Sequence, residues 1–333
     1  MTGRQGVAGR EGVAVRAAAG PNGSPLTGRW ALGADVGGTK IATGLVGPDG
    51  SVHAPHTVPT PAREGAAAIL DAVAGALRPA LDAVPEGVTP YGLGLGTGGV
   101  VDHAAGRIVS ATSLLAGWAG VPAARELERR LGLPVRVDND ARALALGELH
   151  FGAARGRDSV LFAAVGTGIG GALVLQGELL RGEFPCAGEI GHLPVALAAA
   201  EGAECSCGRT GHLEAVAAGP GMTRTYARRG GAPAPDLRAV VERAHAGDAL
   251  ARQVVTEGAA CLGGALGGLV NALGVGAVVI GGGVPGIGPL YWDALEPALR
   301  AELLPACADV AVLPARLGSG AAVAGAAALW ATP

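Results

Sequence analysis

Lysine is almost absent from this chain. It occurs once, at Lys40, although lysine and arginine together number 25 among the 333 residues. Every other basic residue is therefore an arginine, a planar fork where lysine is a compact point charge. A single lysine kept inside a glycine-rich loop indicates a role that a guanidinium does not fill. Aromatic residues are also scarce, at 3%, so the core must be built mainly from Ala, Val, Leu and Ile.

The low charge and the few cysteines exclude several protein classes. A net charge of −3 argues against a nucleic-acid-binding surface. Five cysteines in a chain of this length do not form a disulfide scaffold. Residues 1–28 contain scattered arginines and no apolar signal-peptide run, so we expect a disordered leader and a cytoplasmic protein. The length favours about two domains.

Residues 258–292 contain no charged side chain, which raises the question of a membrane span. Glycines punctuate the run and Asn271 interrupts it, so we expect a buried helix followed by a buried strand, and no membrane partner. Four glycines fall at the spacing that lets a helix pack closely on a neighbour: Gly263, Gly264, Gly267 and Gly268.

The pattern of strand, glycine loop and strand occurs twice. Apolar runs at 30–34 and 41–46 flank one loop, and runs at 159–165 and 172–175 flank another. This repetition predicts a duplicated fold with one copy opening each of two domains. Asp49-Gly50 is a hairpin turn signal. Further helices are predicted at 66–81, 122–131, 141–150, 290–303 and 321–330, and further strands at 91–95, 135–137 and 277–280.

The glycine loops do not match the two commonest nucleotide motifs. The spacing GxGxxG occurs three times, but no copy has both the following helix and strand and the acidic residue of a dinucleotide site. Gly33 and Gly38 have Walker A spacing, yet Thr39-Lys40 follows where Lys then Ser or Thr is required. The first loop still offers successive backbone N–H groups to a phosphate, and Asp35 offers a hard oxygen for Mg²⁺.

Together these loops resemble the phosphate and adenosine motifs of the ROK sugar kinases, within the actin–hexokinase superfamily. Residues 35–40, 166–171 and 281–283 resemble the three motifs, in the family's order. The resemblance implies an α/β fold of two ribonuclease H-like (actin-like ATPase) domains with an active-site cleft between them. The small domain would span 29–143 plus a terminal helix at 319–331, and the large domain 144–318. The implied ATP-binding residues are Asp35, Gly37, Gly38, Thr39, Lys40, Gly166, Thr167, Gly168, Gly282 and Gly283, with Asp35 also holding Mg²⁺.

The run Asp138-Asn139-Asp140 is predicted to end a strand just before a helix. By the resemblance, Asp140 is the catalytic base that takes the proton of the attacking hydroxyl. Asp138 or Asn139 is also a good helix cap. Residues 189–192 resemble the family's ExGH sugar motif. The implied sugar-binding residues are Gly98, Gly99, Asn139, Asp140, Glu189, His192 and Glu214.

Residues 205–212 resemble the family's zinc motif with one departure, since His212 stands where the family usually has a third cysteine. Two thiolates and two imidazoles still make an ordinary tetrahedral zinc site. The implied ligands are His192, Cys205, Cys207 and His212, with the nearby Cys186 left open as an alternative. A second departure is Ser319-Gly320, where many relatives carry an acidic residue after the preceding glycine.

The function that the resemblance implies is ATP-dependent phosphorylation of glucose at its 6-hydroxyl. Kinases of N-acetylmannosamine or N-acetylglucosamine are the alternative, because the motifs do not separate these substrates. A non-catalytic sugar-sensing regulator would need a DNA-binding domain, for which the leader is too short. A polyphosphate donor is disfavoured by the Gly-Gly-Thr-Lys sequence of the first loop. A homodimer or larger homo-oligomer is expected, as in similar proteins.

Overall fold

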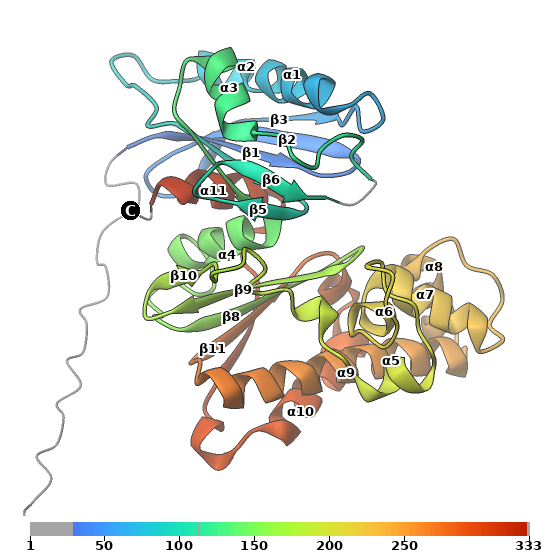
Figure 1. The fold of residues 1–333 in the computed structure, drawn as a ribbon. Coiled ribbons are helices and arrows are strands. Elements are labelled where there is room, and N and C mark those ends of the chain that lie inside the picture. The colour runs from blue at the N-terminus through green and yellow to red at the C-terminus, as the bar shows by residue number, and fades with distance from the viewer. Residues whose placement is uncertain (1–28, 112–113, 332–333) are drawn as a thin grey trace, which may run out of the picture.

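The computed structural model describes residues 29–111 and 114–331, so the predicted leader lies outside the described residues. Two five-stranded sheets lie one above the other (Figure 1). The first has the order β3-β2-β1-β4-β7, with β1 Ala31–Val36, β2 Lys40–Val46, β3 Val52–Pro59, β4 Leu93–Thr97 and β7 Val135–Asn139. The second has the order β10-β9-β8-β11-β12, with β8 Val160–Val165, β9 Ile169–Leu175, β10 Glu178–Leu180, β11 Ala277–Gly281 and β12 Ala311–Pro314.

The two sheets have the same topology. In each, three consecutive strands form an antiparallel meander, and two later strands add in parallel beside the first. The meanders turn at the two glycine loops, since Val36 pairs with Ile41 and Val165 pairs with Ile169. The predicted duplication and the two-part α/β fold are confirmed.

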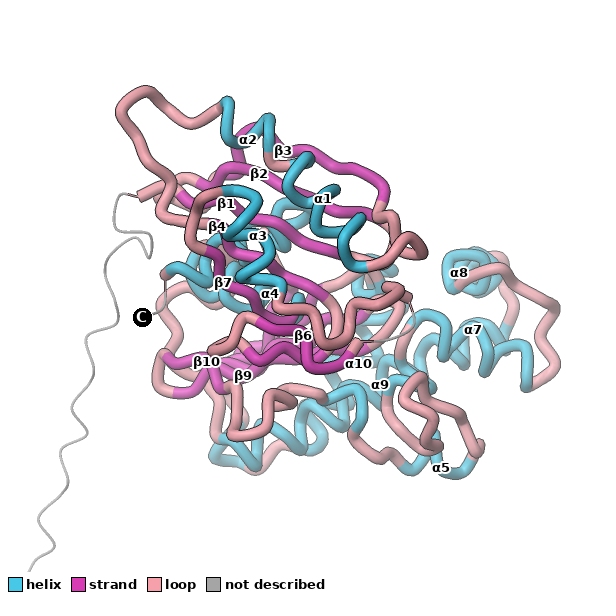
Figure 2. The backbone as a smooth tube through the Cα atoms, turned by 45° about the horizontal axis from the view of Figure 1, so that its top comes forward, coloured by secondary structure: helices cyan, strands magenta, loops and turns pink. Residues whose placement is uncertain are grey.

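Helices α1 (Ala66–Ala76), α2 (Arg78–Asp82) and α3 (Ala123–Leu131) lie along one side of the first sheet (Figure 2). Their apolar faces bury Ile69, Val73 and Leu127 in one cluster with the strands. The single helix predicted over 66–81 is divided at Leu77. Pro79 causes the division, because it has no N–H to donate to the preceding turn.

Helices α4 (Asp140–His150) and α11 (Ala321–Ala327) lie between the two sheets (Figure 1). α4 contacts β8 and β9 of the second sheet and also α11, which itself packs against β1 and β4 of the first sheet. The C-terminal segment thus returns to the first sheet. The domain boundaries at 143 and 318 remain a prediction.

Helix α9 (Ala249–Leu273) is long and apolar enough to cross a membrane by composition, but half of its most apolar stretch is buried within the molecule. It packs along α10 (Pro289–Glu302), with the predicted strand β11 between them in sequence. A Cβ added at Gly263 would lie 2.2 Å from the Leu295 carbonyl oxygen, and one at Gly267 would lie 2.4 Å from that of Leu299. The predicted close helix packing is confirmed, and α9 has the contacts of a core helix.

Several elements were not predicted, including the strands β3, β10 and β12 already described. The others are short helices and strands. They are β5 Val100–Asp102, β6 Arg107–Ser110, α5 Ala196–Ala200, α6 Glu214–Ala217, α7 Gly219–Arg228 and α8 Leu237–His245. Five 3₁₀ turns complete the described structure: η1 Ile190–His192, η2 Val284–Ile287, η3 Pro305–Cys307, η4 Gly318–Gly320 and η5 Ala328–Trp330.

Candidate active site

Two predicted site carboxylates, those of Asp35 and Asp140, meet at the edge of the first sheet. Asp35 lies near the end of β1 in register with Gly96 of β4, and Asp140 is the first residue of α4. A Cβ added at Gly96 would lie 3.4 Å from the Asp35 Oδ1 and 3.7 Å from the Asp140 Cα. Both acidic residues thus flank Gly96, and the structure brings the predicted Mg²⁺ ligand and the predicted base together.

Burial makes both carboxylates weak acids. The pKa of Asp35 is raised from 3.8 to about 7, mainly by burial and also by the charge of Asp140, while Lys40 opposes the shift. Burial also raises the pKa of Asp140, although hydrogen bonds from the Ala141 N–H and from Asn139 lower it. A base with a raised pKa accepts a proton more readily. Two carboxylates that repel each other are also suited to a bound divalent cation, because they provide hard oxygen donors.

Asn139 is the N-cap of α4. Its Oδ1 accepts hydrogen bonds from the backbone N–H groups of Ala141 and Arg142, at 2.9 and 3.3 Å. Its Nδ2 donates to the Gly99 carbonyl oxygen at 3.0 Å. The capping role that the sequence left open therefore belongs to Asn139.

The first glycine loop is a tight hairpin held by Thr60, a residue that the sequence did not single out. The Gly37 N–H donates to the Lys40 carbonyl oxygen at 3.0 Å. Thr60 donates its hydroxyl to the Gly37 carbonyl oxygen at 2.8 Å and its N–H to that of Thr39 at 3.0 Å. Gly38, Thr39 and Lys40 are exposed, as a phosphate site requires.

A cavity of about 850 Å³ opens beside the second glycine loop. It is bounded by that loop, by α7 and α8, and by η2, and its lining includes Gly166, Thr167 and Gly283. The predicted second phosphate loop and part of the predicted adenosine cluster thus face one space. Its volume lies within the range of cofactor pockets. Arg224 and Arg238 add positive charge to the lining.

Gly282 has a structural reason to be glycine. Its φ is +94°, and an added Cβ would lie 2.2 Å from the carbonyl oxygen of Val165 in β8. A side chain here would push the end of β11 away from the second phosphate loop, which follows Val165. Gly282 lines a neighbouring, mainly apolar cavity of about 440 Å³ between α4, α11 and the second sheet.

The departure at Ser319-Gly320 falls in η4, at the start of α11. The backbone entering this turn is fixed to α4, because the Glu148 Oε1 accepts hydrogen bonds from the N–H groups of Arg316 and Leu317, at 2.8 and 2.9 Å. Glu148 is 3% exposed, so it supplies a buried acidic anchor to this segment from the facing helix.

The predicted sugar-binding residues of the second half converge on the loop around η1. The His192 Nε2 lies 3.8 Å from the Glu189 Oε2. Burial raises the pKa of the Glu189 carboxyl, and His192 and Arg142 lower it. Gly98 is near the base, since a Cβ added there would lie 4.0 Å from the Asp140 Oδ2.

Glu214 accepts hydrogen bonds from two loops, the cysteine loop and the second phosphate loop. Its Oε1 accepts a hydrogen bond from the Ser206 hydroxyl at 2.5 Å, and its Oε2 accepts one from the Ile169 N–H at 2.9 Å. A Cβ added at Gly168 would lie 2.6 Å from the same Oε2. Glu214 thus ties the cysteine loop to the second phosphate loop, a link for which the sequence held no local signal.

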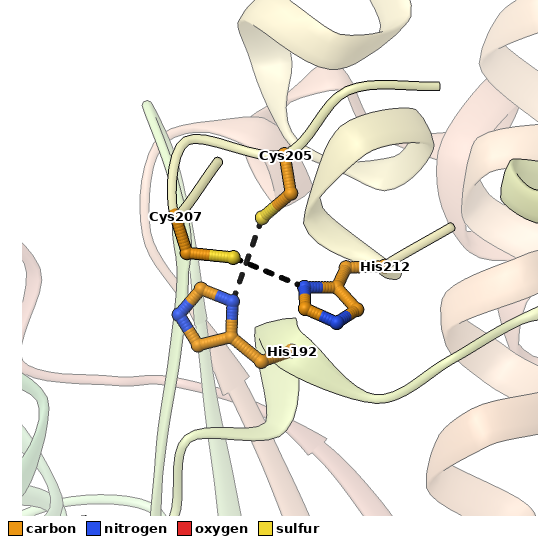
Figure 3. Close-up of side chains that lie close together, drawn as sticks. All are labelled: His192, Cys205, Cys207 and His212. Atoms are coloured by element: carbon orange, nitrogen blue, oxygen red, sulfur yellow. Dashed lines mark hydrogen bonds between the residues drawn. The ribbon is translucent and has the colours of Figure 1, made fainter. Parts of the chain in front are cut away.

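The four predicted zinc ligands form one cluster (Figure 3). The Cys205 Sγ lies 3.5 Å from the His192 Nδ1, and the Cys207 Sγ lies 3.3 Å from the His212 Nδ1. All four ligand atoms lie within 4.8 Å of one another. Zn–S and Zn–N bonds of about 2.3 and 2.0 Å in a tetrahedron separate ligand atoms by roughly 3.3–3.8 Å, so the residues fit zinc. Cys186 is outside this group among the described residues.

Comparisons with known proteins agree with this arrangement. Residues 31–332 match the model of the ROK family. The chain belongs to the ROK family. It is 36% identical to a glucokinase of Halalkalibacterium halodurans, over 90% of this chain and 94% of that protein.

Two further similar proteins are an N-acetylmannosamine kinase and another glucokinase. An N-acetylmannosamine kinase of Escherichia fergusonii is 33% identical, over 90% of this chain and 97% of that protein. The crystal structure of a ROK family glucokinase from Streptomyces griseus, in complex with glucose and AMPPNP, superposes with a TM-score of 0.75. It is 32% identical and covers 90% of this chain and 98% of that one. The chain is therefore a ROK-family sugar kinase by fold and by relatives.

Proposed function

We propose that this ROK protein transfers the γ-phosphoryl group of ATP to the 6-hydroxyl of glucose. The observation that carries the proposal is the meeting of Asp35 and Asp140 around Gly96, on the side of the fold where both glycine loops turn. Phosphoryl transfer needs a base for the hydroxyl proton, a metal-binding carboxylate and loops that bind phosphates. This site has a candidate for each.

The roles follow from position. Asp140 would accept the proton of the attacking hydroxyl, and its raised pKa favours that step. Asp35 would hold Mg²⁺ through water, and Mg²⁺ would neutralise charge on the phosphates. Lys40 and the N–H groups of the first loop would contact the phosphates. The 850 Å³ cavity between the second loop and α8 would take the adenosine, near Gly283.

Zinc would order the sugar side of the cleft. With its Nδ1 directed at the cysteine pair, the His192 ring presents its Nε2 toward Glu189. A metal bound at the Nδ1 fixes the ring and leaves the Nε2–H to donate to a sugar hydroxyl. Glu189 offers a carboxylate that can accept hydrogen bonds from hydroxyls.

Glucose is proposed over N-acetylmannosamine because the glucokinase relative is the more similar of the two, at 36% against 33% identity. The small difference keeps an acetamido-sugar kinase as the second candidate. A cytoplasmic location and a homo-oligomeric state belong to the same proposal.

The test is release of ADP from MgATP with glucose, mannose, fructose, N-acetylglucosamine or N-acetylmannosamine, with the Asp140→Asn variant alongside. We expect turnover of glucose and a fall in kcat of about 100- to 10,000-fold in the variant. Turnover only with an acetamido sugar would replace the substrate and keep the mechanism. An unchanged kcat in Asp140→Asn would show that the base has been misassigned.

A further inference from the structure

The carboxylate of Asp138 is completely buried, two residues before the proposed base. Its Oδ1 lies 3.3 Å from the Arg142 Nη1, and its Oδ2 accepts a hydrogen bond from the Arg181 Nε at 2.8 Å. The His103 Nδ1 lies 3.6 Å from the Oδ2 and interacts mainly with the Val137 carbonyl oxygen, at 2.8 Å. The Oδ1 also accepts the Asn139 N–H at 2.9 Å. Asp138 therefore has partners from both halves of the fold.

Arg142 extends this contact to the sugar loop. It lies on α4, is 2% exposed, and donates through its Nη2 to the carbonyl oxygens of Pro185 and Ala187, at 3.1 and 3.0 Å. Ala187 precedes Glu189 by two residues. The Arg142 guanidinium thus joins the end of β7, just before the proposed base Asp140, to the loop that carries the proposed sugar ligands.

We propose that Arg142 is a positioning residue, which sets the Glu189–His192 segment at a fixed distance from Asp140 by bridging Asp138 to the carbonyl groups of Pro185 and Ala187. The inference rests on the proposed sugar-kinase function. The proposed role is to place the sugar-binding segment relative to the base Asp140. In this role Arg142 contacts neither the sugar nor the nucleotide directly.

The chemistry of the bridge requires arginine. A guanidinium has five donors in a rigid fork and can contact a carboxylate and two carbonyl groups at once, whereas an ammonium is a single point. Lysine at position 142 would keep a cation beside Asp138 and lose the link to the loop. Asp138 and Arg142 are buried, so the loss of one donor would leave a buried acceptor without its hydrogen bond, which is costly.

The Arg142 bridge should affect the binding of the sugar and leave the binding of ATP unaffected. Pro185 and Ala187 lead into the sugar residues. The proposed nucleotide residues lie at Asp35, in the two glycine loops and at Gly282 and Gly283, and the hydrogen bonds of the Arg142 side chain go elsewhere, to Asp138, Pro185 and Ala187. Errors of about 1 Å in the placement of reacting groups cost on the order of 100-fold in rate. Loss of the bridge should therefore weaken sugar binding and kcat and leave ATP affinity nearly unchanged.

The experiment compares Arg142→Lys and Arg142→Met with a matched control, Arg136→Met. Arg136 lies on β7, the strand that precedes α4, donates to the Leu329 carbonyl oxygen at 2.8 Å and stacks over Trp330, away from the site. Affinities for the sugar that the wild type phosphorylates and for AMPPNP are measured separately by calorimetry, together with kcat and the thermal midpoint. Arg142→Lys keeps a cation beside the buried Asp138, so the test does not depend on folding of the methionine variant.

We expect Arg142→Lys to raise the sugar Kd by about 10-fold or more and to lower kcat, with the AMPPNP Kd changed less than about twofold. Arg136→Met should lower the thermal midpoint without changing the ratio of the two affinities. Equal weakening of both ligands by Arg142→Lys, or no weakening of either, would overturn the positioning role. A wild type that phosphorylates no sugar would instead overturn the proposed function on which the role rests.

Discussion

Replacement of Asp35 by asparagine is expected to stabilise the protein in the absence of metal and nucleotide. The pKa of Asp35 is raised from 3.8 to about 7, chiefly by burial. A shift of one unit corresponds to about 1.4 kcal/mol, so about three units correspond to about 4 kcal/mol against the ionised folded state. The carboxylate is partly exposed, which screens some of this penalty. We therefore expect Asp35→Asn to gain about 2–4 kcal/mol at pH 8.

The pH dependence of this gain has a definite sign. Below about pH 4 the carboxyl is protonated in both the folded and the unfolded chain, and the variant and the wild type should be equally stable. As the pH rises, the unfolded chain ionises first, so the wild type loses stability progressively until about pH 7. Thermal melts in EDTA from pH 4 to 8 should show the midpoints separating over this interval, by on the order of 5 °C.

A matched control is Asp49→Asn, in the turn between β2 and β3. Hydrogen bonds from Ser51 lower the pKa of the Asp49 carboxyl, so this variant should gain no stability as the pH rises. MgATP should reverse the order of stability of the two proteins. It should stabilise the wild type more than Asp35→Asn, since the Asp35 carboxylate then has a cation to bind. Parallel melting curves for Asp35→Asn and wild type across pH 4–8 would refute the reasoning from burial.

Two further predictions concern the zinc cluster and the α9–α10 contact. Removal of zinc by a chelator, or the Cys207→Ser substitution, should lower both the thermal midpoint and sugar affinity, because His192 loses its fixed orientation; unchanged sugar affinity in folded, metal-free protein would contradict this. Gly263→Ala should destabilise by about 1–3 kcal/mol, because its Cβ would lie 2.2 Å from the Leu295 carbonyl oxygen. Its control, Gly268→Ala, has nothing within 4 Å and should stabilise by about 0.5–1 kcal/mol; urea unfolding measures both, and a destabilised Gly268→Ala would be the contrary result.

Local signals made much of the fold predictable. Glycine loops between apolar runs marked both meanders, and the resulting sheets have the same strand order. The glycine spacing in α9 predicted a close neighbour, and Gly263 and Gly267 indeed face α10. These features can be predicted from the sequence because each depends on a few adjacent residues. The division of the first helix at Pro79 belongs to the same class and was overlooked.

The missed features depend on contacts between distant residues. Arg142 hydrogen-bonds Pro185 and Ala187, which lie 43 and 45 positions away. Glu214 contacts the Ile169 N–H across 45 positions. No local spacing encodes such pairs, and an arginine on a short helix is more often exposed than buried. The short helices α5–α8 were missed as well, although α8 has apolar residues at helical spacing, with Leu237, Val240 and Val241 packed on one cluster.

The run Asp138-Asn139-Asp140 shows why three adjacent polar residues need not share one role. Asp138 is buried and pairs with arginines from α4 and from the loop after β10, and Asn139 caps α4. Asp140 lies near enough to Asp35 for its charge to raise the pKa of that carboxyl. A strand end followed at once by a helix turns successive side chains in different directions, so the three point to different partners. The cap fixes the first turn of α4, and the buried ion pairs fix the strand before it. The proposed base therefore follows two anchored residues, and in the proposed role the arginine bridge sets its distance from the sugar loop. Selective loss of sugar affinity in Arg142→Lys is the result that this arrangement requires.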